Sequence, residues 1–211
     1  SSAASDVYKR QDKRAAHVPL QHILGKAYFY GYEFEVNEDV LIPRPDTEVL
    51  VGEVIKVTRN GDNILDMCTG SGCILISILK ERADAHGTGV DLSEKALKIA
   101  QENRRTLGME QTTALLQSDL FEQVNGTYDM IVSNPPYIAS EVITTLSEEV
   151  KDHEPVMALD GGPDGLDFYR VIIEKSPSYL TLGGMLFFEI GYDQGVSVSR
   201  LLSLIHISEP T

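Results

Sequence analysis

The chain contains few of the residues that mark metal-binding and disulfide-rich proteins. Its 211 residues include only two cysteines and no tryptophan. A short glycine turn separates Cys68 from Cys73, and no second Cys or His pair is present to complete a tetrahedral zinc site. We therefore expect two reduced thiols and no metal.

Positive charge and long apolar runs are also scarce. The 18 Lys and Arg residues against 32 Asp and Glu residues give a net charge of −14, a field that repels phosphate backbones. No apolar run approaches the roughly 18 residues that a membrane-spanning helix needs. We expect a soluble, cytoplasmic, monomeric protein that binds neither membranes nor nucleic acid directly.

From residue 63 onward, short apolar stretches alternate with longer helical ones, which is typical of an α/β fold with a parallel sheet covered by helices. The pattern predicts strands at 64–68, 88–91, 113–117, 128–133 and 185–190. It predicts helices at 72–82, 93–107, 141–150 and 166–180, the last broken at Pro177. Earlier in the chain, the alternation over 27–42 predicts a short antiparallel hairpin. Asp46 and Thr47 can then cap a helix that ends at Asn60-Gly61.

A glycine-rich turn follows the first predicted strand of the sheet. Thr69-Gly70-Ser71-Gly72 leads directly into a helical pattern, so its backbone N–H groups could approach a ligand. A tight strand-to-helix connection without a ligand explains this turn equally well. Asp91 ends the next strand, nineteen residues after Gly72, where a carboxylate could bind a ribose diol, and the two features together favour a nucleotide site.

The type of nucleotide follows from a missing glycine. Dinucleotide-binding loops have a third glycine, but Cys73-Ile74-Leu75 follows Gly72 here, so adenosine without a pyrophosphate fits better. After the third strand, Asp119 could accept a hydrogen bond from the adenine amino group, and Leu120 could pack on the ring. Asp119 could instead cap a helix or turn.

The fourth strand leads into Asn134-Pro135-Pro136-Tyr137. Two consecutive prolines stiffen this segment and keep Asn134 extended. The side-chain oxygen of Asn134 and the carbonyl of Pro135 can accept both hydrogens of a planar NH2 group beside the Tyr137 ring. Because such a nitrogen is a poor nucleophile, positioning and hydrogen bonding must make it reactive. The alternative is a proline-stiffened turn without a site.

These motifs resemble those of amino-methyltransferases that use S-adenosylmethionine, and further blocks are similar to the HemK/PrmC family. The blocks lie at 19–25, 41–48, 154–159, 164–170 and 188–191. The resemblance implies a Rossmann-like class I S-adenosylmethionine-dependent methyltransferase fold. It also implies methylation of the side-chain amide nitrogen (N5) of the glutamine in the Gly-Gly-Gln motif of peptide chain release factors.

Carried over by position, the resemblance implies a cofactor site and a substrate site. The cofactor site comprises Cys68, Thr69, Gly70, Ser71 and Gly72 near the methionine part, Asp91 at the ribose, Leu120 at adenine, and Asn134 at the methyl end. Asp119 joins it from the position of its strand end alone. The substrate site comprises Asn134, Pro135, Pro136 and Tyr137, with Asn134, Pro135 and Tyr137 as catalytic residues.

Several positions allow more than one interpretation. Cys68 replaces the glycine usual in the family, and a small core side chain is favoured over a nucleophile because no His is nearby in sequence. Arg44 could close over the cofactor or the substrate glutamine, or it could pair with Asp46. For His153 and Glu154, we favour a structural role over acid-base chemistry.

The two ends of the chain resemble nothing in the family. We expect residues 1–16 to be a disordered tail and residues 17–45 to be the remnant of an N-terminal substrate-binding domain plus the hairpin. We assign 46–202 to the catalytic domain and 203–211 to a non-native tail. In this interpretation the chain is a fragment truncated at both ends. It lacks a final antiparallel hairpin, so the sheet has an open edge.

Two other functions remain as alternatives. An adenine-N6 methyltransferase acting on nucleic acid could use the same Asn-Pro-Pro-Tyr segment, although the charge of −14 disfavours it. A fragment that binds the cofactor without catalysis is the second alternative, because both ends of the chain depart from the family.

Overall fold

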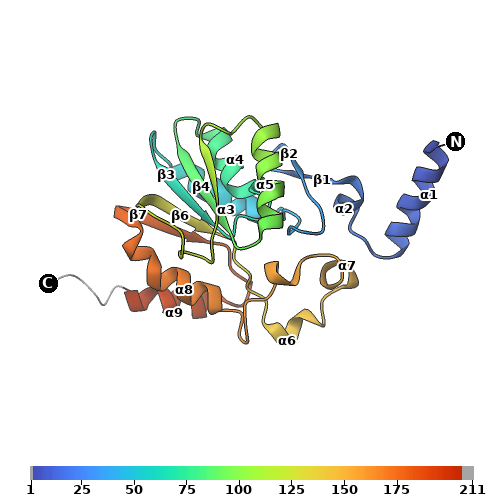
Figure 1. The fold of residues 1–211 in the computed structure, drawn as a ribbon. Coiled ribbons are helices and arrows are strands. Elements are labelled where there is room, and N and C mark those ends of the chain that lie inside the picture. The colour runs from blue at the N-terminus through green and yellow to red at the C-terminus, as the bar shows by residue number, and fades with distance from the viewer. Residues whose placement is uncertain (1, 206–211) are drawn as a thin grey trace.

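The computed structural model describes residues 2–205 and has a five-stranded parallel sheet at its centre (Figure 1). The strands are β3 (Asn63–Met67), β4 (His86–Asp91), β5 (Thr113–Gln117), β6 (Tyr128–Ser133) and β7 (Leu180–Phe188). Their order is β5-β4-β3-β6-β7, so the chain moves outward from β3 in one direction and then in the other. The carboxyl ends of β3, β4 and β6 therefore meet at a topological switch point, where ligands bind in open α/β sheets.

The five predicted strands are confirmed, with their largest shift at β7. This strand begins five residues before the predicted start at Met185, because the ladder to β6 contains an irregularity between Tyr128 and Met130. Gly183 adopts a positive φ of 80° within that irregularity. Regular pairing begins at Met185 and continues to the Ser133–Phe188 pair, which fixes the register at the carboxyl end of the sheet.

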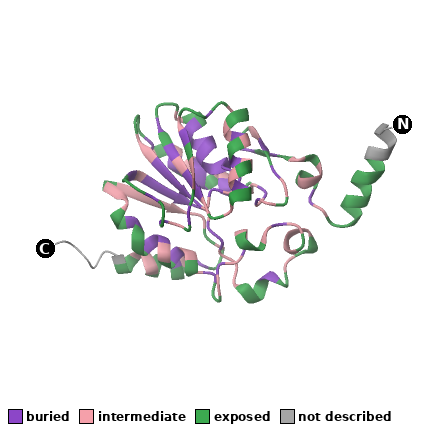
Figure 2. Ribbon diagram, viewed as in Figure 1, coloured by how far each residue is buried: buried purple, intermediate pink, exposed green. Residues whose placement is uncertain are grey.

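Helices cover both faces of the sheet, as the sequence predicts (Figures 1 and 2). One face carries α3 (Thr47–Val57), α4 (Cys73–Glu81) and α5 (Glu94–Thr106), and the other carries α8 (Asp167–Lys175) and α9 (Gly195–Ile205). Residues 73–79 of α4 are all buried, because this apolar helix lies between the sheet and α3. Each Å2 of apolar area buried stabilises the fold by about 25 cal/mol. The buried layer formed by α4 therefore fixes the position of the glycine turn that precedes it.

The predicted hairpin is present but shorter than expected. Its strands are β1 (Lys26–Phe29) and β2 (Tyr32–Glu35), joined at Tyr30 and Gly31. Both turn residues have positive φ, as two-residue hairpin turns of this kind require. Phe29 and Phe34 pack edge to face and are buried against α3 and α4, so the hairpin belongs to the main core.

The expectation of a disordered tail over residues 1–16 is wrong for secondary structure. Residues Ser2–Ala15 form helix α1, which projects from the body (Figure 1), and α2 (Leu20–Leu24) follows it. Ala, Lys, Arg and Gln favour helix without needing an apolar face, which is why apolar periodicity gives no sign of α1. Side chains 7–15 are exposed, and Arg14 pairs with Glu149 on the body.

The single helix predicted at 141–150 is also wrong, because the structure has α6 (Ser140–Ile143) and α7 (Glu148–Lys151) separated by a turn. The hydroxyls of Thr144 and Thr145 donate to backbone carbonyls of the preceding turn, and this local bonding competes with helix propagation. A 3-10 turn, η1 (Val156–Ala158), follows. Helix α8 ends at Lys175 and continues as η2 (Ser176–Ser178), so the predicted break at Pro177 is confirmed.

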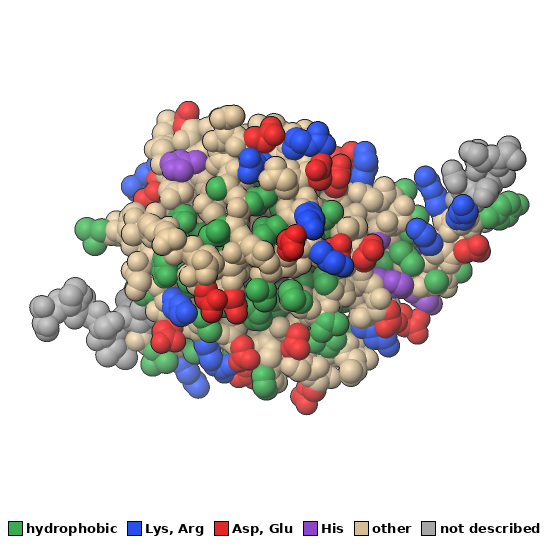
Figure 3. Space-filling view, viewed as in Figure 1, with side chains coloured by type: hydrophobic (Ala, Val, Ile, Leu, Met, Phe, Trp, Pro, Cys, Tyr) green, Lys and Arg blue, Asp and Glu red, His purple; other side chains and the backbone are tan. Residues whose placement is uncertain are grey.

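The end of the described chain also differs from expectation. Helix α9 was not predicted, and it includes residues 203–205 of the segment expected to be a tail, while 206–211 lie outside the described residues. In residues 2–205, β7 pairs only with β6, so this strand forms an open edge as predicted. No helix in that range is long and apolar enough to span a bilayer. Charged side chains of both signs are scattered over the face shown in Figure 3.

Candidate functional site

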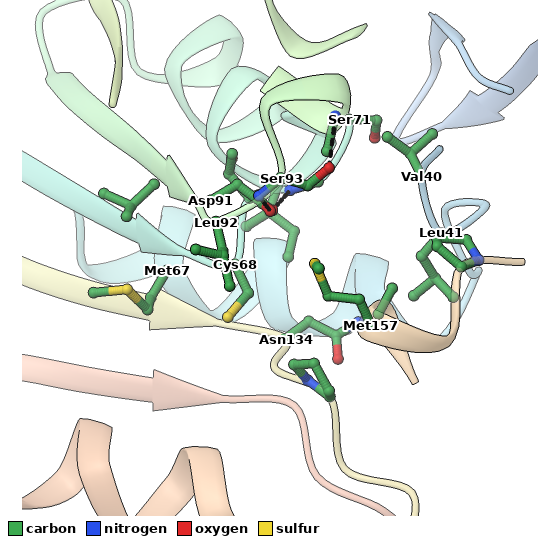
Figure 4. A pocket seen from close by; sticks show the side chains of 18 of the residues that line it. Val40, Leu41, Met67, Cys68, Ser71, Asp91, Leu92, Ser93, Asn134 and Met157 are labelled. Carbon is green, nitrogen blue, oxygen red and sulfur yellow. Dashed lines mark hydrogen bonds between the residues drawn. The ribbon is translucent and has the colours of Figure 1, made fainter. Parts of the chain in front are cut away.

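A cavity of about 320 Å3 opens at the carboxyl ends of β3, β4 and β6 (Figure 4). Its volume lies within the range of small-molecule sites in proteins. Several parts of the chain line it, including the turn after β3, the ends of β4 and β5, the segment after β6, and two loops around Arg44 and Met157.

The turn between β3 and α4 has alternating left-handed residues, with φ of 64° at Cys68, 54° at Gly70 and 79° at Gly72. A Cβ on Gly72 would lie 3.1 Å from the Ile76 side chain and 3.4 Å from Ala100, whereas Gly70 faces open space. Thr69 anchors the turn. Its hydroxyl donates to Asp66 Oδ2 at 2.6 Å, and its N–H donates to a carbonyl of β4 at 2.9 Å.

Asp91 connects the turn to the end of β4. Its two carboxylate oxygens accept hydrogen bonds from the N–H groups of Gly70, at 2.8 Å, and of Ser93, at 2.9 Å. Burial raises the pKa of this carboxyl, and the backbone donors oppose the rise. Each carboxylate oxygen has a second lone pair, so Asp91 can still accept hydrogen bonds from a ligand diol.

The far end of the cavity is apolar, with one exposed carboxylate. Leu92, Leu120 and Phe168 line it together with Asp119. Leu120 adopts a φ of 46°, and its carbonyl accepts from the hydroxyl of the buried Ser118 at 2.8 Å, which stabilises this turn. Two leucines and a phenylalanine provide flat apolar surface on which a heteroaromatic ring can pack.

Two loops hold the Asn134-Pro135-Pro136-Tyr137 segment rigidly in place. Gly161 and Gly165 approach so closely that a Cβ on either would lie within 3 Å of the backbone of Pro136 or Tyr137. Beside Gly165, Gln194 Nε2 donates to the carbonyls of Tyr137, at 2.9 Å, and of Gly165, at 3.1 Å. Asn134 is half-buried at the cavity wall, with its Nδ2 3.4 Å from the Thr47 hydroxyl.

Acidic groups dominate the electrostatics of the cavity. Burial raises the pKa of Asp66 to about 7, and Asp66 Oδ1 has no hydrogen-bond partner among the described residues. Burial also raises the pKa of Cys73 to about 12 and that of Cys68 well above its ordinary value, with Asp91 and Asp66 adding to the rise at Cys68. Both thiols therefore stay protonated, which argues against a nucleophilic role.

The loop that carries Arg44 covers the cavity mouth. The Arg44 guanidinium donates to Glu154 Oε1 at 2.5 Å, and the Glu154 side chain is only 1% exposed. Of the two alternatives for Arg44, pairing with Asp46 is wrong, because the buried carboxylate of Glu154 is the partner. Asp46 itself makes no side-chain cap to α3, contrary to the capping prediction. A structural role for Glu154 agrees with this pairing.

Comparisons with known proteins agree with this geometry. A family model described as the methyltransferase small domain matches residues 45–152. Curated release factor glutamine methyltransferases from Caulobacter vibrioides and Thermodesulfovibrio yellowstonii are 45% and 40% identical to the chain. These matches cover 90% and 95% of this chain, and 67% and 74% of the relatives. The chain belongs to the release factor glutamine methyltransferase family.

Solved structures of other methyltransferases share the fold. The ribosomal protein L11 methylase of Lactobacillus delbrueckii subsp. bulgaricus matches with a TM-score of 0.57 at 22% identity, over 80% of this chain and 72% of that one. A methyltransferase from Pyrococcus furiosus matches with a TM-score of 0.61 at 17% identity, over 97% and 87% of the two chains. These likenesses concern the fold, and they confirm the predicted class I S-adenosylmethionine-dependent methyltransferase fold.

In this member of the release factor glutamine methyltransferase family, most of the predicted site residues come together at one cavity. Those that line it are Arg44, Cys68, Thr69, Gly70, Ser71, Asp91, Asp119, Leu120, Asn134 and Pro136. Gly72 and Pro135 are buried, and Tyr137 is half-buried with its hydroxyl directed at Glu189. Gly72, Pro135 and Tyr137 are therefore placed to support the wall of the cavity.

The sequence analysis missed several residues of the site. Leu92 directly follows Asp91, and an apolar residue after a strand-ending acid is a signal that could have indicated it. Met157 lines the cavity and is 55% exposed, and the block at 154–159 that contains it resembles the family without indicating a site role for this residue. Thr47 and Glu189 reach the Asn134 region from α3 and from the end of β7, and no local sequence signal connects them.

Proposed function

We propose that this chain transfers a methyl group from S-adenosylmethionine to the side-chain amide nitrogen of the glutamine in the Gly-Gly-Gln motif of peptide chain release factors. The observation that carries the proposal is the position of Asn134. It directly follows β6, at the start of a rigid Asn-Pro-Pro-Tyr segment, and lines the same cavity as the glycine turn and Asp91. Curated relatives at 40–45% identity, named for this activity, support it.

The cavity fits a cationic adenosine derivative. Asp91 and Asp119 line the cavity and both raise the pKa of the Cys68 thiol, so negative charge converges on the turn after β3. Asp66 also has a buried oxygen without a partner among the described residues. Asp91 would hold the ribose, Leu92, Leu120 and Asp119 the adenine, and the turn at 68–72 the methionine part. When bound, S-adenosylmethionine supplies a methyl group on a positively charged sulfur.

The protein contributes orientation to the reaction. Asn134 Oδ1 and the Pro135 carbonyl would accept the two hydrogens of the glutamine amide, so that its nitrogen faces the methyl group. A carbon–nitrogen bond forms as the sulfur–carbon bond breaks, and the electron pair of that bond stays on the sulfur as a neutral thioether. The nitrogen then releases one proton to water, so no side chain is needed as a general base.

The release factor is therefore the partner that we propose, in the cytoplasm, with this chain acting as a monomer. The net charge of −14 disfavours nucleic acid as a partner. In Figure 3, Lys and Arg side chains gather on the projecting α1, and on the body they are interspersed with Asp and Glu. The basic stripe typical of a nucleic-acid surface is thus missing from the body on that face of the described residues.

A transfer assay with two substrates in parallel tests this proposal. The protein is incubated with S-adenosylmethionine labelled in its methyl group and with either a purified release factor or adenine-containing DNA. Label on the release factor alone supports the proposal. Label on DNA would favour an adenine-N6 methyltransferase, whose substrate also presents an exocyclic amino group. Cofactor binding without transfer to either substrate would favour a catalytically impaired fragment.

A further inference from the structure

Glu189 lies next to Asn134 because of the register between β6 and β7. Ser133 pairs with Phe188 in the parallel ladder, and the N–H of Glu189 donates to the Ser133 carbonyl at 3.0 Å. The hydroxyl of the buried Tyr169 donates to the Glu189 carbonyl at 2.8 Å, which fixes the backbone from the side of α8. The Glu189 side chain is thus held beside the residue that follows Ser133.

The carboxyl group of Glu189 is surrounded by polar groups of the same site. Its Oε1 lies 3.5 Å from the Tyr137 hydroxyl, and its Oε2 is buried without a partner in the described residues. Burial raises the pKa of Glu189, while hydrogen bonding from Thr47, and more weakly from Tyr137 and Asn134, opposes the rise. Asp46 raises it further, and the net effect of all these groups is a raised pKa.

These contacts determine which groups donate. The Asn134 Nδ2–H donates to the Thr47 oxygen at 3.4 Å. An ionised carboxylate can only accept, so Glu189 is the acceptor toward Thr47, Tyr137 and Asn134, the three groups whose hydrogen bonding lowers its pKa. Because an amide carries its oxygen opposite its NH2 group, Asn134 Oδ1 remains available on the cavity side.

Building on the proposed function, we infer that Glu189 and Thr47 are positioning residues that fix the direction of the Asn134 amide. Without them, the amide can rotate by half a turn and present its NH2 group to the substrate. Two NH2 groups facing each other have no acceptor between them, so the substrate amide would lose one of its two hydrogen bonds. Thr47 and Glu189 therefore determine the fraction of molecules in which Asn134 Oδ1 faces the substrate amide.

Two substitutions at Thr47 separate this role from packing. Thr47→Val keeps the shape of the side chain but removes the hydroxyl, and Thr47→Ser keeps the hydroxyl but removes the methyl group. We expect Thr47→Val to lower kcat by about tenfold to a hundredfold, with cofactor Kd within about threefold of wild type. Thr47→Ser restores most of kcat. A purely structural role would instead make the two variants equally impaired.

Glu189→Gln and Thr58→Val complete the set. Glu189→Gln replaces the obligate acceptor by a group that can also donate, so we expect an intermediate loss of kcat. Thr58 lies at the other end of α3, is 8% exposed, and donates to the Val54 carbonyl at 2.7 Å. Thr58→Val therefore removes another buried hydroxyl, at the C-cap of the same helix, without reaching Asn134, and we expect kcat to stay at the wild-type value.

A spectroscopic measurement on the wild-type protein tests the amide direction without any assay of activity. In the proposed orientation, the side-chain NH2 protons of Asn134 give nuclear Overhauser effects to the methyl group of Thr47. Their absence would overturn the inference, as would wild-type kcat in Thr47→Val. If the wild-type protein transfers no methyl group to a release factor, the proposed function is contradicted. The nuclear Overhauser effects would still show, independently of activity, which way the Asn134 amide points.

Discussion

Arg44 and Glu154 form an ion pair that joins two loops over the cavity mouth, although 110 residues separate them in sequence. Glu154 Oε2 also lies 3.4 Å from the N–H of Ile42, so the buried carboxylate holds both the start and the end of this proline-rich turn. Burial raises the pKa of Glu154, and Arg44 is the largest influence opposing it. The pair therefore links the segment before α3 to the loop after α7.

Removing Arg44 should leave a buried carboxylate without its partner. We expect Arg44→Ala to lower the free energy of unfolding by about 1–3 kcal/mol, less than for a fully buried pair because the Arg44 side chain is 36% exposed. In a Glu154→Gln background the same substitution should cost clearly less, as urea unfolding of the four proteins would measure. An equal cost in both backgrounds would show that the two side chains are not coupled.

The left-handed conformation of Cys68 predicts an unusual order of stabilities. At a φ of 64°, glycine avoids a steric cost of about 1–2 kcal/mol that any other residue bears. We therefore expect Cys68→Gly to be more stable than Cys68→Ala, by about 1 kcal/mol after the greater freedom of glycine in the unfolded chain is subtracted. Ala114→Gly, in β5, is the control and should show the opposite order relative to alanine. Cys68→Ala at least as stable as Cys68→Gly in thermal unfolding would refute the argument.

The buried carboxyl of Asp66 should make stability depend on pH. Its pKa rises from an ordinary 3.8 to about 7 in the folded protein, so between these values only the folded chain binds the proton. Stability contributed by this group is complete below pH 3.8 and is lost as pH rises to 7, at a slope of about 1.4 kcal/mol per pH unit. Asp66→Asn imitates the protonated acid, so its stability relative to wild type should increase from pH 5 to pH 7. A constant difference across that range would mean that Asp66 ionises normally.

Asp91 should govern cofactor affinity. Its carboxylate holds the turn through Gly70 and, in our proposal, also the ribose, so calorimetry should show cofactor Kd at least about tenfold weaker in Asp91→Ala. Asp91→Asn retains one acceptor oxygen and should fall between Asp91→Ala and wild type. Asp119→Asn is the control, because the exposed Asp119 side chain should contribute less. Unchanged affinity in Asp91→Ala would remove Asp91 from the cofactor site.

The parts of the site that could be predicted from sequence are those where one strand places a residue directly. Asp91 ends one strand and Asn134 follows another, and parallel strands bring their carboxyl ends to one edge of the sheet. The partnership of Glu189 with Asn134 could not be predicted in this way, because it depends on the register between β6 and β7. Arg44 pairs with the distant Glu154 and not with its neighbour Asp46. The packing of the two loops determines this choice of carboxylate, and sequence alone does not show that packing.

The fold shows the same limit. Strands 113–117 and 128–133 agree with the prediction residue for residue, because each is an apolar run with clear turn signals at its ends. Helix α1 lacks an apolar face, and α9 packs its apolar residues on α8, a contact that only the tertiary structure reveals. Local patterns predicted elements that bury a regular face, and they failed where polar composition or distant packing decided the structure.

The most direct test of the central claim locates the transferred methyl group within the release factor. After incubation with S-adenosylmethionine, tandem mass spectrometry of the peptide containing Gly-Gly-Gln should show one added methyl group on the glutamine side chain. Asn134→Ala, with cofactor Kd within about threefold of wild type, should leave this peptide unmodified. A methyl group on any other residue, or equal modification by Asn134→Ala, would contradict the account.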